Sequence, residues 1–123
     1  MRVIIHDYTD PYFNMAAEEY LLENETQDVF MLWRNDNAVV IGKNQNTWAE
    51  VNVPFTEAHG ITVVRRLSGG GAVFHDLGNV NFTYITAHDP ARGIDFRPFI
   101  DPILRALAAL GVQAEADGRN DIV

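Results

Sequence analysis

The sequence contains no cysteine and a single lysine, Lys43, and positive charge is scarce in it. Without cysteine, these residues can form no disulfide framework, no thiolate metal site and no cysteine nucleophile. Nine lysines and arginines stand against 17 aspartates and glutamates, which gives a formal net charge of −8. A chain this acidic lacks the basic field needed to bind nucleic acid or an anionic membrane. We therefore expect neither partner.

Long apolar runs are also missing. There is no charged-then-apolar leader, and no hydrophobic stretch approaches the length of a membrane span. These absences predict a cytoplasmic protein. At 123 residues the chain is at most one modest domain, and its 47% hydrophobic content is enough for a core.

The most unusual stretch runs from Arg65 to Asn79: Arg-Arg-Leu-Ser-Gly-Gly-Gly-Ala-Val-Phe-His-Asp-Leu-Gly-Asn. It lies between a β-branched run at 61–64 and an alternating run at 79–86, so we expect a strand, a tight glycine loop and a return strand. Three consecutive glycines add no packing, but they let the main chain approach a ligand and aim its amides at it. The arginines and the serine add donors for phosphate or carboxylate oxygens. Residues 65–79, the signature loop, therefore predict a small anionic ligand.

The signature loop matches neither common phosphate-binding pattern. It lacks the Gly-Lys-Ser/Thr of a P-loop and the spaced glycines of a dinucleotide-binding turn. A glycine-rich hairpin with solvated arginines is the structural alternative. The adjacency of Arg65 and Arg66 argues against that alternative, because like charges repel unless an anion lies between them.

The segment after Asp10 predicts a helix. Asp10 is a suitable N-cap, and Pro11 tolerates the first helical position. Glu18, Glu19 and Glu23 are expected on its solvated face. Apolar residues at helical spacing predict a buried stripe made of Phe13, Ala16, Ala17, Tyr20 and Leu21.

The rest of the chain predicts short strands and helices. Apolar runs at 29–34 and 38–42, separated by Asn-Asp-Asn, predict a β-hairpin. The amide-rich segment 42–46 is either a surface loop or a wall of the ligand site. Further expected elements are a strand at 3–6, short helices at 47–50 and 55–59, a strand at 112–116 and a polar loop at 117–121. A helix is expected at 96–110, with its regular part beginning at Pro102, because proline is disfavoured inside a helix. This order has too few helices for a doubly wound sheet and predicts an α+β fold, with a mixed, mainly antiparallel sheet and packed helices.

The signature loop resembles that of the lipoate–protein ligase family, which shares one adenylate-forming fold with biotin protein ligases. The likeness continues in family order at 10–19 (Asp-Pro-Tyr-Phe-Asn-Met-Ala-Ala-Glu-Glu), 32–35 (Leu-Trp-Arg-Asn), 39–46 (Val-Val-Ile-Gly-Lys-Asn-Gln-Asn) and 118–122 (Gly-Arg-Asn-Asp-Ile). Residues 1–123 thus resemble the amino-terminal part of a catalytic domain. The resemblance implies a biotin/lipoate protein ligase-like α+β fold that is incomplete in these residues.

The resemblance also implies a two-step reaction. The carboxylate of lipoate attacks the α-phosphate of ATP, which gives lipoyl-adenylate and pyrophosphate, and an acceptor lysine then takes the acyl group and releases AMP. ATP, Mg²⁺ and lipoate are the implied ligands. The implied partners are lipoyl domains of 2-oxoacid dehydrogenase or glycine-cleavage proteins. Neither step needs a covalent enzyme intermediate, so catalysis rests on positioning and on stabilisation of developing charge.

The motif implies roles for individual residues. It places ATP and adenylate binding at Arg66, Gly71, Ala72, Val73, Phe74 and Asn79. It places contacts to lipoate and the acyl-phosphate at Ser68, Arg65 and His75, although a structural role for His75 in the loop is an alternative. Asp121 is the implied Mg²⁺ contact.

The final residues, 121–123, resemble the start of a strand, and the family's lysine segment would lie beyond Val123. Lys43 belongs to a different motif, so we expect no catalytic residue in this chain and little or no ligase activity from it alone. Exposed sheet edges are expected to promote association. Two rival functions stay open. One is an octanoyl or lipoyl transferase of the same superfamily, whose cysteine would also lie beyond Val123, and the other is a non-catalytic module that binds nucleotide or acyl-adenylate.

Overall fold

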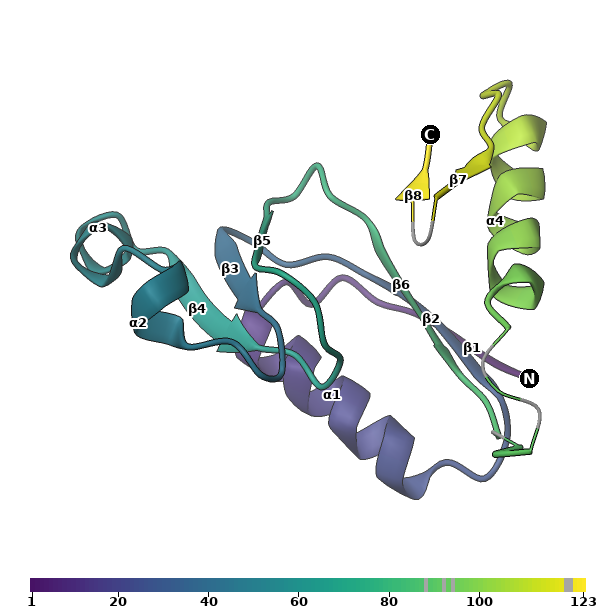
Figure 1. Cartoon of the computed structure of the whole chain (residues 1–123), viewed down its shortest axis with the longest axis horizontal. Helices are drawn as coiled ribbons and strands as arrows, with labels where there is room; N and C mark the ends of the chain where they lie inside the picture. Colours follow the sequence, from purple (N-terminus) through teal and green to yellow (C-terminus); the bar gives the residue numbers. More distant parts are fainter. Residues whose placement is uncertain (88, 92, 94, 119–120) are drawn as a thin grey trace. The chain divides into compact units, whose positions relative to one another are not determined.

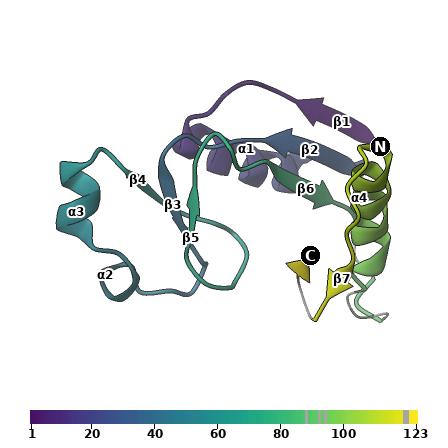
Figure 2. The same ribbon diagram turned by 90° about the horizontal axis from the view of Figure 1, so that it is seen from above.

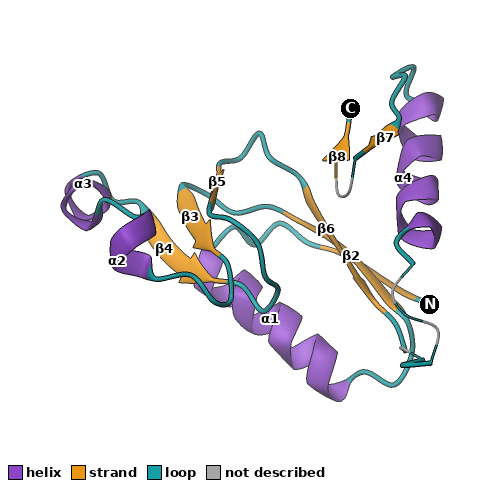
Figure 3. Cartoon of the chain, viewed as in Figure 1, coloured by secondary structure: helices purple, strands orange, loops and turns teal. Residues whose placement is uncertain are grey.

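The computed structural model describes residues 1–87, 89–91, 93, 95–118 and 121–123 (Figures 1 and 3). The chain divides into two compact units, Met1–Ala87 and His88–Val123. Both units combine helices with strands, and the fold is α+β with mixed sheets, as the sequence predicts.

The unit Met1–Ala87 holds two three-stranded sheets. In the first sheet, β2 (Val29–Trp33) lies between β1 (Arg2–Ile5), which is parallel to it, and β6 (Asn81–Ile85), which is antiparallel. In the second sheet, β3 (Ala38–Ile41) lies between β4 (Thr62–Arg65), which is parallel to it, and β5 (Val73–His75), which is antiparallel. Each sheet therefore has two edge strands within this unit.

The predicted hairpin of residues 29–34 and 38–42 is wrong, because β2 and β3 belong to different sheets. The connection between them is anchored to a helix and does not form a free turn. Asn35 is completely buried, and Asn14 donates hydrogen bonds to its side chain and to the carbonyl of Arg34. This anchoring turns the chain from the first sheet into the second.

The predicted return strand after the glycines is also placed differently. Residues 79–86 supply β6, which pairs with β2 in the first sheet. The strand that follows the glycines is the short β5, inside the signature loop, and it pairs with β3 and not with β4. The signature loop therefore crosses from one edge of the second sheet to the other and then leads into the first sheet.

This unit contains three helices, and side-chain caps define where they start. The helices are α1 (Pro11–Asn24), α2 (Thr47–Glu50) and α3 (Val53–Ala58), and their N-caps are Asp10, Asn46 and Asn52. Each cap side chain accepts a hydrogen bond from a backbone amide of the first turn, which satisfies an otherwise unpaired donor. α1 runs alongside both sheets and packs against β4 and β6 (Figures 1 and 2).

The buried face of α1 differs from the predicted one. Of the expected stripe only Leu21 is buried, whereas Phe13 and Tyr20 are exposed. The covered line is Pro11, Asn14, Glu18 and Leu21, which has helical spacing but includes two polar residues. Glu18 is not on the solvated face as expected, because it accepts a hydrogen bond from Thr83 in the first sheet. Hydrophobicity alone misplaced the face because half of its members are polar.

The core follows the two sheets. Leu21, Val29, Met31 and Trp33 form the main cluster, and Ile4, Met15 and Ile85 pack against it. In the second sheet Ala38, Val40, Ile41 and Val64 are buried. The main cluster therefore joins β1, β2 and β6 to α1.

The unit His88–Val123 contains α4 (Arg97–Ala109) and a two-stranded antiparallel ribbon of β7 (Ala116–Asp117) and β8 (Asp121–Ile122). α4 continues through Pro102, contrary to the expected late start, at the loss of one intrahelical hydrogen bond. The expected strand at 112–116 is reduced to its last residue plus Asp117. Arg119 and Asn120, part of the 118–122 motif, lie outside the described residues. In the described part of the chain, no helix has the length and apolarity to cross a membrane.

Candidate functional site

A cavity of about 320 Å³ lies in Met1–Ala87, where the signature loop meets α1 and the first sheet. Its lining combines polar and apolar side chains: Met15, Glu18, Trp33, Val40, Arg66, Ser68, Val73, His75, Val80, Asn81, Phe82 and Thr83. The volume is at the small end of the range for ligand sites, and the mixture of apolar walls with a few polar groups is typical of them. We call it the loop cavity.

The guanidinium of Arg66 is the positive group of the loop cavity. Its Nε and Nη2 atoms donate to the carbonyl of Gly69 (3.3 and 3.0 Å), and Nη2 also donates to the carbonyl of Gly71 (2.8 Å). Nη1 makes a longer bond to the carbonyl of Val40 (3.4 Å). The loop thus curls around its own arginine. Four hydrogen bonds leave one of the five guanidinium N–H groups for a ligand.

The amides of the glycine run remain available. In the described structure, the N–H groups of Gly69, Gly70, Gly71 and Ala72 donate to no protein acceptor, while the carbonyls of Gly69 and Gly71 face Arg66. Gly70 has φ 110°, a backbone conformation that residues other than glycine rarely adopt. This peptide orientation turns carbonyls toward the arginine and leaves donors free.

A close approach between Gly42 and the backbone of Gly70 also fixes the position of the glycine run. A Cβ atom on Gly42 would overlap the carbonyl of Gly70, so only glycine allows this contact. The backbone of Lys43 donates to the carbonyl of Ser68 (2.9 Å). The segment 42–46 therefore supports the signature loop, and none of its residues lines the loop cavity.

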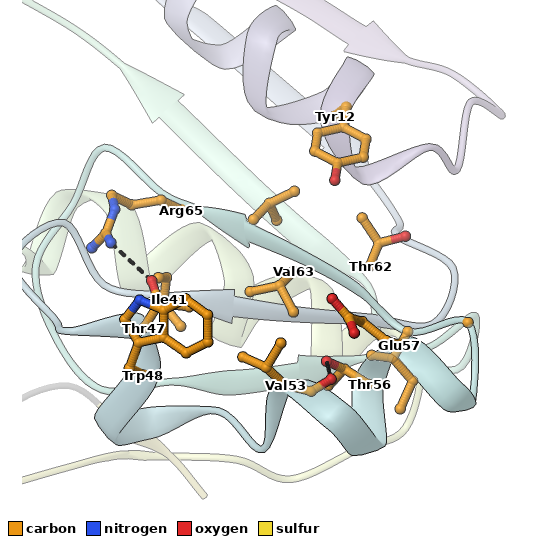
Figure 4. Close-up of a pocket in the computed structure, with 13 residues that line it drawn as sticks. Tyr12, Ile41, Thr47, Trp48, Val53, Thr56, Glu57, Thr62, Val63 and Arg65 are labelled. Atoms are coloured by element: carbon orange, nitrogen blue, oxygen red, sulfur yellow. Dashed lines mark hydrogen bonds between the residues drawn. The ribbon is translucent and has the colours of Figure 1, made fainter.

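Arg65 and Arg66 point to different sites. Arg65 ends β4, and its Nη1 donates to the carbonyls of Gly42, Lys43 and Gln45 (2.9, 3.2 and 2.7 Å). Its Nη2 reaches the hydroxyl of Thr47 (3.1 Å), beside Trp48, in a separate hollow of about 630 Å³ (Figure 4). Successive residues of an extended chain face opposite sides, so the two positive charges are separated without an anion between them.

His75 lines the loop cavity and is otherwise buried. Its Nδ1 atom lies 3.2 Å from the side-chain nitrogen of Asn35, and its ring makes an edge-type contact with Trp33. Burial, together with the nearby positive charge of Arg66, lowers the pKa of His75 below its ordinary value. The imidazole is therefore neutral at pH 7.

Glu18 provides the opposite electrostatic case in the same cavity. The indole N–H of Trp33 donates to the hydroxyl of Thr83 (2.9 Å), and that hydroxyl donates to Glu18 (2.5 Å). Burial raises the pKa of Glu18, and the hydrogen bond from Thr83 partly opposes this rise. The cavity thus holds an acid that resists ionisation and a base that resists protonation.

Comparison with known proteins decides the family. The family model for the lipoyl protein ligase A/B catalytic domain matches residues 10–123. The chain belongs to this family. It is 50% identical over 119 residues to lipoate–protein ligase 1 of Staphylococcus aureus, which covers 95% of this chain and 36% of the relative. The chain thus spans about a third of the length of the curated ligases it matches.

Solved ligase structures share the fold. P. falciparum LipL1 in complex with lipoate has a TM-score of 0.87 at 34% identity, over 98% of this chain and 40% of that one. An archaeal bi-partite lipoate protein ligase, solved with its E2 lipoyl domain from Thermoplasma acidophilum, has a TM-score of 0.88 at 28% identity, over 98% and 49%. Lipoate-protein ligase A bound with ATP has a TM-score of 0.85 at 28% identity, over 98% and 51%. The biotin/lipoate ligase-like fold predicted from the sequence is confirmed.

The structure gathers only some of the residues expected from the ligase motif. Arg66, Ser68, Val73 and His75 line the loop cavity. Gly71 and Ala72 lie in the exposed glycine run, Phe74 is 53% exposed, and the side chain of Asn79 donates to Asn81, the first residue of β6. Arg65 lies in the separate hollow of Figure 4.

Several cavity residues escaped the sequence analysis. Glu18 and Trp33 lie within segments that resemble the ligase family, but only the tertiary fold brings them to the signature loop. Asn81 also lines the cavity, and its Nδ2 atom is buried without a hydrogen-bond partner among the described residues. A buried donor without a partner is costly, and a ligand acceptor would satisfy it.

Asp121, the expected metal contact, lies in β8 opposite Asp117 in the unit His88–Val123. In the part of the chain that the structure describes, no group of three or more histidine and acidic residues is arranged to hold a metal ion. The described residues therefore do not form an Mg²⁺ site by themselves.

Proposed function

We propose that residues 1–123 form the amino-terminal part of the catalytic domain of an ATP-dependent lipoate–protein ligase. In this proposal the protein forms lipoyl-AMP from lipoate and ATP and transfers the lipoyl group to a lysine of an acceptor lipoyl domain, in the cytoplasm. The observation that carries the proposal is the composition of the loop cavity. The cavity combines cationic and hydrogen-bonding groups of the signature loop with apolar side chains from α1, β2, β3 and β6.

That composition suits a carboxylate with an apolar tail. In this proposal Arg66, Ser68 and His75 form the polar end of the ligand site. The cavity also has the polar residues Glu18, Asn81 and Thr83, and its apolar walls are Met15, Trp33, Val40, Val73, Val80 and Phe82. An acyl tail buried along these walls is stabilised by about 0.8 kcal/mol for each CH₂ group removed from water. The polar end fixes the carboxylate where it can meet the phosphate of ATP.

The free amides of Gly69–Ala72 and the remaining N–H of Arg66 are the proposed phosphate contacts. In the first step a carboxylate oxygen of lipoate displaces pyrophosphate from the α-phosphate of ATP. Negative charge grows on the phosphate oxygens, and preorganised amides and a guanidinium stabilise that charge without reorganising. In this proposal Ser68, which lines the cavity, donates to the carboxyl oxygen. Arg65 keeps the role that the ligase motif implies only if its contacts to residues 42–47 are released.

Mg²⁺ takes no assigned step in this proposal. The described residues do not form a metal site, and Mg²⁺ in such reactions is often held largely by substrate phosphates and water. Asp121 remains the residue of this chain predicted to contact it.

The acceptor is proposed to be a lipoyl domain of a 2-oxoacid dehydrogenase or a glycine-cleavage protein. One structural relative was solved with its E2 lipoyl domain, which supports this class of partner. Turnover by the chain alone is expected to be weak or absent, because the lysine segment implied by the ligase motif is not among its residues.

Ligand binding in the loop cavity can be measured by the fluorescence of Trp33, which lines it. The chain has two tryptophans, of which Trp33 lines the loop cavity and Trp48, 79% exposed, lines the other hollow. In a Trp48→Phe variant, titration with lipoate or with a non-hydrolysable lipoyl-adenylate analogue should change the emission of Trp33 saturably. Ser68→Ala should weaken the affinity about tenfold, the effect of one hydrogen bond to a charged group. A Trp33 signal indifferent to both ligands would overturn the proposal.

Turnover can be tested in a chimera. The segment of the Staphylococcus aureus ligase that aligns with this chain would be replaced by residues 1–123, since the two are 50% identical there. The chimera should lipoylate an acceptor lipoyl domain and release pyrophosphate only with ATP. Adenylate binding by the chimera without transfer would favour the non-catalytic module instead.

A further inference from the structure

A line of buried polar side chains leads from α1 to the loop cavity. Asn14 and Asn35 are each 0% exposed, and His75 is 8% exposed. Such burial of amides is costly unless their hydrogen bonds are satisfied. Anchoring of the connection after β2 accounts for the burial of Asn14 and Asn35, but it does not explain why Asn35 also contacts His75.

Backbone carbonyls fix the orientation of the first amide. The Nδ2 atom of Asn14 lies 3.1 Å from the carbonyl of Tyr8 and 2.9 Å from the carbonyl of Arg34, and carbonyls only accept hydrogen bonds. The opposite orientation would set the amide oxygen of Asn14 against these oxygens. The present orientation leaves Oδ1 of Asn14 buried without a partner among the described residues, which is the lesser cost.

The first amide then fixes the second. Nδ2 of Asn14 also lies 2.9 Å from Oδ1 of Asn35, so the oxygen of Asn35 faces Asn14. Two N–H groups serve three acceptors here, so one of them is shared. Reversing Asn35 would place two NH₂ groups against each other. The side-chain nitrogen of Asn35 must therefore face His75, at 3.2 Å from Nδ1.

The second amide fixes the histidine. Because Asn35 donates to Nδ1, that nitrogen carries a lone pair, and in the neutral ring the proton sits on Nε2. No hydrogen bond within the described residues occupies Nε2, and His75 lines the loop cavity next to Arg66 and Ser68. The ring thus offers the cavity an N–H donor.

The surroundings keep the ring neutral. Arg66 approaches from the end of β4, and its positive charge together with burial lowers the pKa of His75. Glu18 is the ionisable group that α1 contributes to the cavity, and β2, β3 and β6 contribute to its lining Trp33, Val40, Asn81, Phe82 and Thr83, none of which ionises at neutral pH. A neutral histidine cannot act as a cation toward the ligand, so its contribution depends on which nitrogen carries the proton.

We propose that Asn14 and Asn35 are positioning residues that hold His75 as the Nε2–H tautomer, so that a neutral donor faces the carboxyl group of the acyl ligand. The proposal rests on the proposed function for the identity of the ligand. The tautomer itself can be tested without any ligand. With the proton on Nδ1, the cavity would instead meet the carboxylate with a lone pair and repel it.

The first experiment is a long-range ¹H–¹⁵N correlation spectrum of the 123-residue chain at pH 8, which distinguishes the two tautomers of each of its four histidines. Loss of one signal set in a His75→Gln variant assigns His75. We expect the Nε2–H pattern for His75 in the unaltered chain. An Nδ1–H pattern, an even mixture or an imidazolium would each overturn the proposal, and each would be read from the spectrum of the unaltered chain.

The second experiment reverses the direction of the hydrogen bond between residue 35 and Nδ1 of His75. Asn35→Asp places a carboxylate next to Nδ1 of His75, and a carboxylate can only accept a hydrogen bond. His75 should therefore switch to the Nδ1–H tautomer. The negative charge should also raise the pKa of His75. Lipoate affinity, followed by Trp33 emission in a Trp48→Phe, Glu18→Gln background that removes the titration of Glu18, should fall about tenfold near pH 9. It should recover toward about pH 6, because the imidazolium again carries a proton on Nε2.

The matched control is Asn24→Asp, which adds the same charge at an exposed position at the end of α1. It should change neither the tautomer nor the pH profile. A loss in Asn35→Asp that is the same at every pH, with the tautomer unchanged, would mean that Asn35 is only structural. Failure of the unaltered chain to bind lipoate while His75 shows the Nε2–H pattern would overturn the proposed function and the ligand role, but not the tautomer assignment.

Discussion

Glu18 is the residue whose ionisation opposes folding most clearly. Its carboxyl is partly buried between α1 and the first sheet, where it accepts a hydrogen bond from Thr83, and burial raises its pKa. A raised pKa in the folded state means that the folded chain holds this proton more tightly than the unfolded chain. Its favourable contribution is therefore complete below the unfolded pKa and is lost as the pH rises through the folded pKa.

The Glu18→Gln substitution should remove this pH dependence. An amide oxygen can still accept from Thr83, so at low pH the variant and the parent should agree within about 0.5 kcal/mol in free energy of unfolding. As the pH rises through the folded pKa, the parent should lose stability relative to the variant. Urea unfolding between about pH 4 and pH 8 measures this difference. Parallel stability curves across that range would contradict the assigned environment of Glu18.

Gly42 is the residue on which the shape of the signature loop depends most directly. Gly42→Ala places a methyl group on the carbonyl of Gly70, so the glycine run must move. We expect a loss of about 2 kcal/mol in unfolding free energy, together with loss of lipoate binding. Gly69→Ala is the matched control in the same loop, because a Cβ there meets nothing within 4 Å. Equal destabilisation by the two variants in denaturant titrations would refute the close approach.

At the level of elements, the open edges of the sheets are the feature with a measurable consequence. β1 pairs only with β2 among the described strands, and its Val3 and Ile5 are 57% and 71% exposed. An exposed apolar edge strand is a template for pairing with another chain, and a lysine on the edge disfavours such pairing. Association through this edge is thus expected of the isolated chain.

Val3→Lys should reduce that association. The substitution is expected to cost less than about 0.5 kcal/mol in stability, because Val3 is already exposed. Sedimentation velocity over a range of concentrations should show that the parent chain forms larger species and that Val3→Lys shifts the distribution toward monomer. Val112→Lys, at an exposed position outside the strands, is the control. A parent chain that stays monomeric, or an equal effect of both lysines, would count against the edge.

In the whole molecule, the two units differ in how much of each is buried. The buried residues all belong to Met1–Ala87, and none of the described side chains of His88–Val123 falls in the buried class. A unit this small, without a core of its own, has little stability by itself. Its helix α4 has an apolar face at Phe99, Ile103, Leu104 and Leu107, but each of these side chains is only half-buried.

Hydrogen exchange should reveal this difference in stability. Amides of α4 should exchange roughly 100-fold faster or more than those of β2 and β3, as expected where opening is local and does not require global unfolding. The measurement is native-state exchange of the 123-residue chain, read by NMR or by mass spectrometry of peptides. Equal protection of α4 and β2 would show that the second unit is as stable as the first.

The sequence by itself determined the family, the fold class and the position of the signature loop. Caps, turn residues and glycines act locally, so Asp10, the Asn35–Asn37 break and the glycine run could be located without any tertiary contact. The resemblance of the signature loop then gave the expected fold and chemistry. What the sequence could not give was the partner of each strand, because pairing joins residues far apart in the chain and similar apolar runs are interchangeable by pattern.

Only the tertiary structure decided which polar residues face inward. Asn14 and Glu18 share the covered face of α1 and would be assigned to solvent by hydrophobicity. They are placed instead by partners on the connection after β2 and on β6. The separation of Arg65 from Arg66 has the same origin, since it depends on which sides of β4 are occupied. Local propensity sets the elements of this chain. The residues that line its cavity are decided by hydrogen bonds between partners that only the folded sheets bring together.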